Sequence, residues 1–130
     1  MLDRAIDVPD AAMLHALRTA GRLALVDGDA KEIMPGIVVY TGGKHTFQSQ
    51  YAGVRTAKGT VVIASDNMYL YENLEQHVPI AQTLDAVSNL AAQTRMTTLA
   101  ALPALIVPGH DPLVFQRFTV VKSNVVRIAP

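Results

Sequence analysis

The sequence predicts a layered α/β domain with a mixed, largely antiparallel sheet and helices on one face. Short β-branched runs follow one another through tight turns, which is typical of antiparallel strands joined locally. One long helical segment then leads into a short buried strand. Half of the 130 residues are hydrophobic, so residues 1–130 can form the core of a single domain. This order fits one sheet of an αββα sandwich, a fold in which the second sheet packs on the inner face.

The first third of the chain is expected to hold one helix and three strands. Met13, Leu14 and Leu17 recur at helical spacing after Pro9, and Gly21 ends this helix. Apolar runs separated by turns then predict strands at residues 23–26, 32–34 and 37–40.

The rest of the chain predicts a hairpin, a long helix and a closing strand pair. The hairpin joins residues 50–56 to 60–64. The long helix opens at Thr83 or Asp85 and runs to about Leu102, before Pro103. Its inward candidates are Leu84, Val87, Ala91 and Leu99. A short strand at 104–107, a helical turn at 112–118 and strands at 119–121 and 125–128 complete the prediction.

Composition excludes several functional classes. The 11 basic and 11 acidic residues balance, so no strongly basic surface is available for nucleic acid. No apolar stretch approaches the roughly 18 to 20 residues that span a bilayer. The start of the chain, Met1–Asp7, carries acids and lacks the apolar core of a secretory signal. We therefore expect a cytoplasmic protein with neither a nucleic-acid nor a membrane partner.

Three polar segments each begin where an apolar, β-branched run ends. They are Thr-Gly-Gly-Lys-His-Thr ending at Thr46, Ala-Ser-Asp-Asn-Met-Tyr ending at Tyr69, and Pro-Gly-His-Asp-Pro ending at Pro112. In α/β sheets, such strand ends present ligands to a site.

These segments supply two imidazoles and one carboxylate, on His45, His110 and Asp66. Because the chain has no cysteine, any metal must be held by nitrogen and oxygen, and these groups suit zinc and similar divalent ions. Nearby glycines are expected to let the backbone turn beside a metal, where a Cβ would crowd it. They are Gly42, Gly43 and Gly109.

In this order the motifs resemble those of the metallo-β-lactamase-fold hydrolases, in particular the N-acyl homoserine lactonase-like branch, over the C-terminal half of that fold. The resemblance implies that His45, Asp66 and His110 are metal ligands and that Asp66 bridges two metals. It also implies that Tyr69 lies close to the substrate carbonyl and takes part in catalysis with Asp66. Residues 71–74 and 78–79 are similar to the same branch. The implied activity is zinc-dependent, quorum-quenching hydrolysis of lactones or related esters.

The sequence departs from the family in one major respect. The His-x-His-x-Asp-His motif, which supplies most metal ligands in these enzymes, is absent, and His15 stands alone. The resemblance therefore implies that an N-terminal half is missing from this chain, or that a homo-oligomer completes the site. The alternative is a non-catalytic half-fold or fragment that self-associates through its exposed sheet face.

Each candidate ligand also has a purely structural interpretation. His45 fits a loop histidine bonded to a backbone group. Asp66 fits a turn residue or a helix N-cap, and Asp111, next to His110, fits a helix cap. His77 fits a surface position. The sequence leaves these interpretations open.

Overall fold

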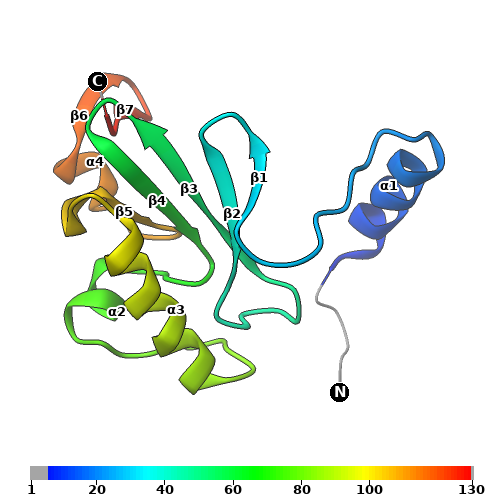
Figure 1. The fold of residues 1–130 in the computed structure, drawn as a ribbon, viewed down its shortest axis with the longest axis horizontal. Helices are drawn as coiled ribbons and strands as arrows, with labels where there is room; N and C mark the ends of the chain where they lie inside the picture. The colour runs from blue at the N-terminus through cyan, green and yellow to red at the C-terminus, as the bar shows by residue number, and fades with distance from the viewer. Residues whose placement is uncertain (1–5, 130) are drawn as a thin grey trace.

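The structure is a computed structural model that describes residues 6–129 (Figure 1). Within these residues, the strands of the main sheet are β1 (Lys31–Met34), β2 (Ile37–Thr41), β3 (Gln50–Thr56), β4 (Gly59–Ser65) and β5 (Ile106–Pro108). Strands β6 (Thr119–Lys122) and β7 (Val125–Arg127) form a separate hairpin. The helices are α1 (Val8–Thr19), α2 (Tyr71–Glu75), α3 (Ala86–Leu99) and α4 (Val114–Arg117). None of the helices in the described range has the length and apolar character that a bilayer span requires.

The pairing of β4 makes the sheet mixed. Strands β1 to β4 pair antiparallel in succession, whereas β5 pairs parallel to β4. Since β2 and β4 both run antiparallel to β3, the C-terminal ends of β2, β4 and β5 lie at one edge of the sheet. The predicted mixed, largely antiparallel sheet is confirmed, and its topology places the three polar segments at the same edge.

The two faces of the sheet carry separate apolar cores, because neighbouring residues of a strand point to opposite sides. On one face, Val62 of β4 packs in a buried cluster with Met96 of α3. On the other, Val61 packs in a cluster that includes Phe118 and Ile128 from the C-terminal segment. An apolar cavity of about 390 Å³ remains between this segment and β3 and β4. The face of the sheet opposite α3 is therefore partly covered by the C-terminal segment of the same chain.

The long helix faces the sheet differently from the prediction. It begins after Asp85, whose side chain accepts the Ser88 N–H, and it ends at Leu99 rather than Leu102. Val87, predicted to face inward, is 78% exposed. Leu84 and Ala91 are exposed as well, Leu99 packs against the core, and the buried face consists of Asn89, Ala92, Gln93 and Met96. Counting apolar residues missed this face because two of its members are amides whose polar groups pair with neighbouring loops.

The N-terminal segment contributes little to either core. Helix α1 forms as predicted and ends before Gly21, whose φ is +66°, yet none of its residues is buried. Figure 1 shows α1 standing apart from the sheet. The strand predicted at residues 23–26 is wrong, because this exposed run has no neighbouring strand with which to form a ladder. Helix α2 was not expected, since five residues are too few to show a hydrophobic period.

Candidate functional site

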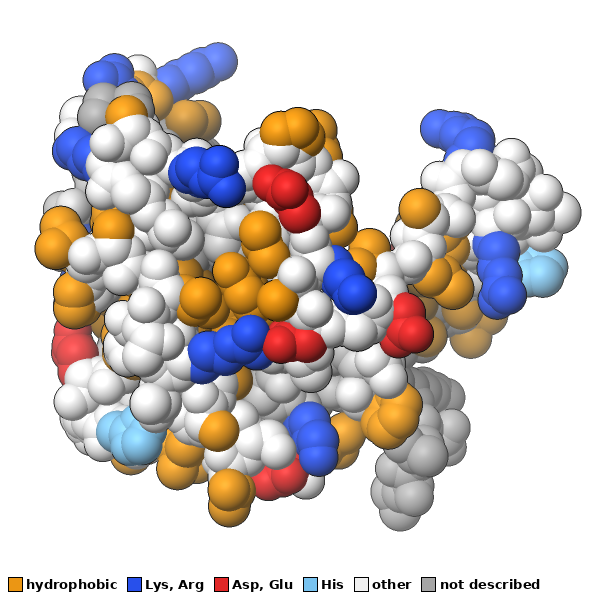
Figure 2. All heavy atoms as spheres, in the orientation of Figure 1, with side chains coloured by type: hydrophobic (Ala, Val, Ile, Leu, Met, Phe, Trp, Pro, Cys, Tyr) orange, Lys and Arg blue, Asp and Glu red, His pale blue; other side chains and the backbone are white. Residues whose placement is uncertain are grey.

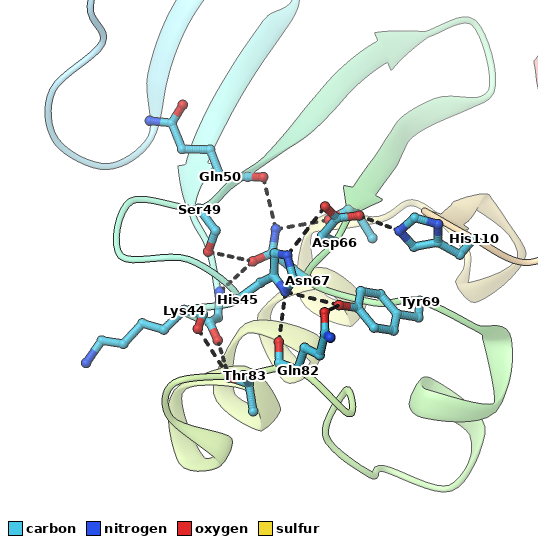
Figure 3. Close-up of polar contacts among 12 residues, drawn as sticks. Lys44, His45, Ser49, Gln50, Asp66, Asn67, Tyr69, Gln82, Thr83 and His110 are labelled. Atoms are coloured by element: carbon cyan, nitrogen blue, oxygen red, sulfur yellow. Dashed lines mark hydrogen bonds and ion pairs between the residues drawn. The ribbon is translucent and has the colours of Figure 1, made fainter. Parts of the chain in front are cut away.

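Three loops bring the sequence-predicted ligands to one edge of the sheet (Figure 3). His45 follows β2, Asp66 follows β4 and His110 follows β5. The backbone N–H of His110 donates to the backbone carbonyl of Tyr69 at 3.0 Å. This hydrogen bond fixes the loop of Asp66 against the loop of His110. The topology therefore assembles two imidazoles and a carboxylate from distant parts of the chain.

The Asp66 carboxylate lies at the centre of this group. Its Oδ1 is 2.6 Å from His110 Nε2, and its Oδ2 is 3.6 Å from His45 Nε2. The first contact is a short hydrogen bond in which the imidazole donates, whereas the second is too long to be one. The side chains of Asp66, His110 and His45 are 44%, 59% and 20% exposed. A small molecule or another polypeptide can therefore reach the group from solvent.

A separate contact fixes the ring of His45. Its Nδ1 lies 2.8 Å from the backbone carbonyl oxygen of Gln82. Because a carbonyl only accepts, Nδ1 carries a proton, and in the neutral ring the lone pair is on Nε2, the nitrogen that faces Asp66. A hydrogen bond from the second ring nitrogen to a carbonyl is the usual way in which metal-binding histidines are oriented.

Tyr69 lies against both imidazoles. Its ring meets those of His45 and His110 edge-on, with centroid distances of 5.7 and 5.0 Å. The phenol oxygen is 3.1 Å from His45 Nδ1 and 3.5 Å from Gln82 Oε1. Since Nδ1 is a donor, the phenol accepts there and directs its own proton towards Gln82. Burial, and then the charge of Asp66, raises the pKa of Tyr69, so the phenol keeps its proton at neutral pH.

Sequence reasoning missed Gln82. Its contact with His45 uses a backbone carbonyl, which any residue type supplies, so no sequence signal could have found it. Several hydrogen bonds hold the segment after Gln82 against the His45 loop. Leu84 N–H donates to the Lys44 carbonyl at 2.9 Å, and Thr83 Oγ1 donates to the Gly43 carbonyl at 3.1 Å.

The glycines near the site have a packing role that was not predicted from the sequence. A Cβ on Gly43 would lie 2.6 Å from Asn89 Cα, and a Cβ on Gly109 would lie 2.7 Å from the Ser65 carbonyl oxygen. A Cβ on Gly42 would collide with Asn67 Oδ1. Glycine is therefore needed here for close packing on buried asparagines and on the end of β4. Crowding of a metal by a Cβ stays a prediction.

The structural interpretations hold for some of these residues. Asp111 accepts the N–H groups of Leu113 and Tyr71, both at 2.9 Å, and so caps the helical turn that follows it. His77 Nε2 lies 3.2 Å from Thr94 Oγ1, on the exposed surface. His45 combines both interpretations, because it is bonded to a backbone carbonyl and also faces Asp66.

The donor types at this edge suit a divalent cation, but the donor set in the described chain is incomplete. Two imidazole nitrogens and a carboxylate are chemically appropriate for zinc. Among residues 6–129, however, no three His, Cys, Asp or Glu side chains form a group that could hold a metal ion. In the present arrangement the Nε2–H group of His110 donates a hydrogen bond to Asp66. Binding of a metal through Nε2 would require this nitrogen to lose its proton.

Solved structures with the same fold include metal-dependent hydrolases. One is an N-acyl homoserine lactone hydrolase with N-hexanoyl-L-homoserine bound at its catalytic metal centre, with a TM-score of 0.63 and 25% identity. Another is a mutant of B. thuringiensis AiiA with N-decanoyl-L-homoserine at its active site, with the same TM-score of 0.63 and 25% identity. Each match covers 75% of this chain and 39% of the other chain. A protein from Staphylococcus aureus described as a probable metal-dependent hydrolase has a TM-score of 0.59 and 17% identity, covering 71% of this chain and 33% of the other.

These neighbours define the class of fold. Neither a protein-family model nor a curated protein shows significant similarity to the sequence. The chain has the metallo-β-lactamase fold over the matched region and spans about two fifths of the length of the lactonases it matches. The matched structures include N-acyl homoserine lactonases, the branch that the order of the motifs resembles.

Proposed function

We propose that this chain supplies part of the active site of a metal-dependent hydrolase that cleaves lactones or related esters. The observation that carries the proposal is the convergence of His45, Asp66 and His110 beside Tyr69, at the sheet edge formed by β2, β4 and β5. A matched lactonase holds an acyl homoserine product at its metal centre, which supports a small lactone as the substrate class.

In this proposal three side chains hold the cation together with ligands from elsewhere. His45 and His110 would bind zinc or a similar divalent ion through Nε2, and Asp66 would bind through its carboxylate. A bound divalent cation supplies a water-derived nucleophile at neutral pH. The remaining ligands would come from outside these 130 residues, either from an N-terminal half of the fold or from a second copy in a homo-oligomer.

Tyr69 would stabilise charge that develops on the substrate. Its phenol is protonated, and its contact with Gln82 Oε1 is long, at 3.5 Å, so a carbonyl oxygen can readily replace that partner. The phenol would donate a hydrogen bond to the lactone carbonyl oxygen as negative charge forms there. The Gln82 backbone carbonyl meanwhile keeps the proton of His45 on Nδ1.

Zinc titration of the purified chain tests the ligand assignment. Calorimetry measures the affinity, and native mass spectrometry measures the number of bound ions. We expect His45→Gln, Asp66→Asn and His110→Gln each to weaken zinc binding by about tenfold or more. The matched control is His77→Gln, which removes an exposed imidazole remote from the site and should leave the affinity unchanged.

Turnover tests the proposed chemistry. In an assembly that hydrolyses N-acyl homoserine lactones, we expect Asp66→Asn to abolish activity. A metal-free assembly without turnover would contradict the proposal, as would zinc affinity that none of the three ligand variants lowers.

A second candidate function is an association module without catalysis. The observation that favours it is exposed apolar surface, since large apolar patches mark interaction sites. Figure 2 shows apolar side chains open to solvent on α1 and between charged side chains over the body of the molecule. Val8, Leu25 and Met34 are among those exposed. Sedimentation of the zinc-free chain tests this function: a dimer without turnover supports it, and a monodisperse monomer contradicts it.

A further inference from the structure

The side chain of Asn67, the residue after the candidate bridging carboxylate, is only 1% exposed. Its Oδ1 accepts the Gly43 N–H at 2.8 Å and the Ser49 hydroxyl at 3.0 Å. Its Nδ2 donates to the carbonyl oxygens of Gln50 at 2.9 Å and Ala64 at 3.0 Å. A carboxamide has two donor hydrogens and two principal acceptor positions, so every hydrogen-bonding position of this side chain is used.

The partners of Asn67 belong to segments that meet at the site. Gly43 and Ser49 flank His45 in the loop after β2, whereas Ala64 lies in β4 just ahead of Asp66. One buried amide therefore joins the loop of His45 to the strand of Asp66, as Figure 3 shows.

The surroundings of Asn67 keep its amide in this position. Asn89, which is fully buried in α3, donates from Nδ2 to the Asn67 backbone carbonyl at 3.0 Å. Gly42 N–H donates to the Ser49 carbonyl at 2.7 Å and closes the loop over the amide. Because a Cβ on Gly42 would collide with Asn67 Oδ1, the loop can lie this close only with glycine there.

The two histidines differ in how much they need such support. His110 is held by its own hydrogen bond to Asp66 at 2.6 Å and by its N–H bond to the Tyr69 carbonyl. His45 lies 3.6 Å from Asp66 and makes no hydrogen bond with it. The Gln82 backbone carbonyl and the Tyr69 phenol orient its ring through Nδ1, whereas the backbone that carries the ring is placed by its loop. The loop, in turn, is joined to β4 through Asn67.

We propose that Asn67 is a positioning residue that holds His45 opposite Asp66 and thereby sets the geometry of the cation site. The cation in this inference rests on the proposed function, whereas the positioning role can be tested without any metal. Asn67 itself does not touch the reacting atoms.

NMR of the full, zinc-free chain tests the geometry. In the wild-type chain, nuclear Overhauser effects should connect the Tyr69 ring to both the His45 and His110 rings, whose centroids lie 5.7 and 5.0 Å away. In Asn67→Ala we expect the His45–Tyr69 effect to be lost and the His110–Tyr69 effect to remain. A general loss of stability would weaken both nuclear Overhauser effects, not the His45–Tyr69 effect alone.

Asn73→Ala is the matched control. Asn73 is also a buried asparagine, but its Oδ1 accepts the Leu70 N–H at the start of α2 instead of binding the His45 loop. Both ring contacts should persist in this variant. Ser49→Ala, which removes a single hydrogen bond to Asn67, carries the same test if Asn67→Ala does not fold. Equal loss of both contacts in the folded test variant, or loss of neither, overturns the positioning role.

Zinc titration separates this inference from the proposed function. We expect Asn67→Ala to bind zinc about tenfold more weakly than the wild-type chain, and Asn73→Ala to bind it equally well. A wild-type chain that binds no zinc contradicts the proposed cation site. The positioning role of Asn67 is then tested only by the nuclear Overhauser effects between the Tyr69 ring and the two histidine rings. If the wild-type chain binds zinc and Asn67→Ala binds it equally well, Asn67 does not set the geometry of the cation site.

Discussion

Met96 in α3 and Met13 in α1 occupy helices of similar length, yet Met96 is fully buried and Met13 is 54% exposed. Helix α3 packs on the sheet through apolar contacts and through amides that bind neighbouring loops. Helix α1 has apolar residues at helical spacing but buries none of them. The difference shows that apolar spacing predicts a helix, whereas the partner against which the helix packs depends on groups elsewhere in the chain.

The largest expected effect follows directly from these two methionines. Met96→Ala should lower the free energy of unfolding by about 3 kcal/mol, because it leaves a cavity between α3 and the sheet. Met13→Ala should change it by less than about 0.5 kcal/mol. Urea unfolding of both variants, followed by circular dichroism, measures the contrast. Equal effects would show that α1 packs against the domain in solution.

The next effect concerns the buried amide of α3. Asn89→Ala should lower the free energy of unfolding by about 2 kcal/mol, because the Ile80 N–H and the Asn67 carbonyl both lose their side-chain partner. Faster hydrogen exchange at the Ile80 amide should accompany it. Thr98→Ala, on the exposed side of the same helix, is the control and should stay within about 0.5 kcal/mol of the wild-type chain. An Asn89 variant as stable as this control would contradict the structural role of the amide.

A smaller effect is expected where the segment after α1 meets α3. The Asp29 carboxylate binds Arg95 through both oxygens at 2.9 Å, and these bonds, with the Thr41 N–H, lower the pKa of Asp29 to about 2. Because the folded-state pKa lies below the usual value of 3.8, the stabilisation is present above about pH 3.8 and is lost as the pH falls through about 2.

Asp29→Asn should therefore destabilise the chain by about 0.5 to 1 kcal/mol near neutral pH, a modest value because both side chains are partly exposed. The difference should shrink in high salt, be much smaller at pH 2 and vanish below it. Urea titrations under these conditions measure it. A difference that persists unchanged at pH 2 would show that the ion pair is not its cause.

The smallest effect on stability is expected at α1 itself. Replacing Met13 and Leu14 by lysine should change the free energy of unfolding by less than about 0.5 kcal/mol, since neither side chain is buried. If the wild-type chain self-associates through this face, sedimentation should show that the double variant does so less. A double variant that associates as strongly as the wild-type chain would assign the interface to another surface.

The strands were predictable because they pair with neighbours close in the sequence. Strands β2, β3 and β4 form consecutive antiparallel ladders, and the loops after β2 and β4 carry His45 and Asp66. The run at residues 23–26 is also apolar, but no strand pairs with it. Composition alone does not distinguish these two cases.

The side chains of the candidate site were predictable in type, but their support was not. His45, Asp66 and His110 stand at strand ends, a position visible in the sequence. The groups that hold them are a backbone carbonyl at Gln82 and buried amides at Asn67 and Asn89. Those contacts depend on loops meeting in three dimensions, so hydrophobic periodicity and motif spacing do not detect them.

The single parallel pairing in the sheet also sets the order in which the chain can assemble. Strands β2, β3 and β4 are consecutive, so His45 and Asp66 can meet once a local meander has formed. Asp66 and His110 are 44 residues apart, and their contact must wait for a crossover that closes a longer loop at a greater entropic cost. During synthesis from the N-terminus, the first half of the site can therefore form before its last histidine has left the ribosome.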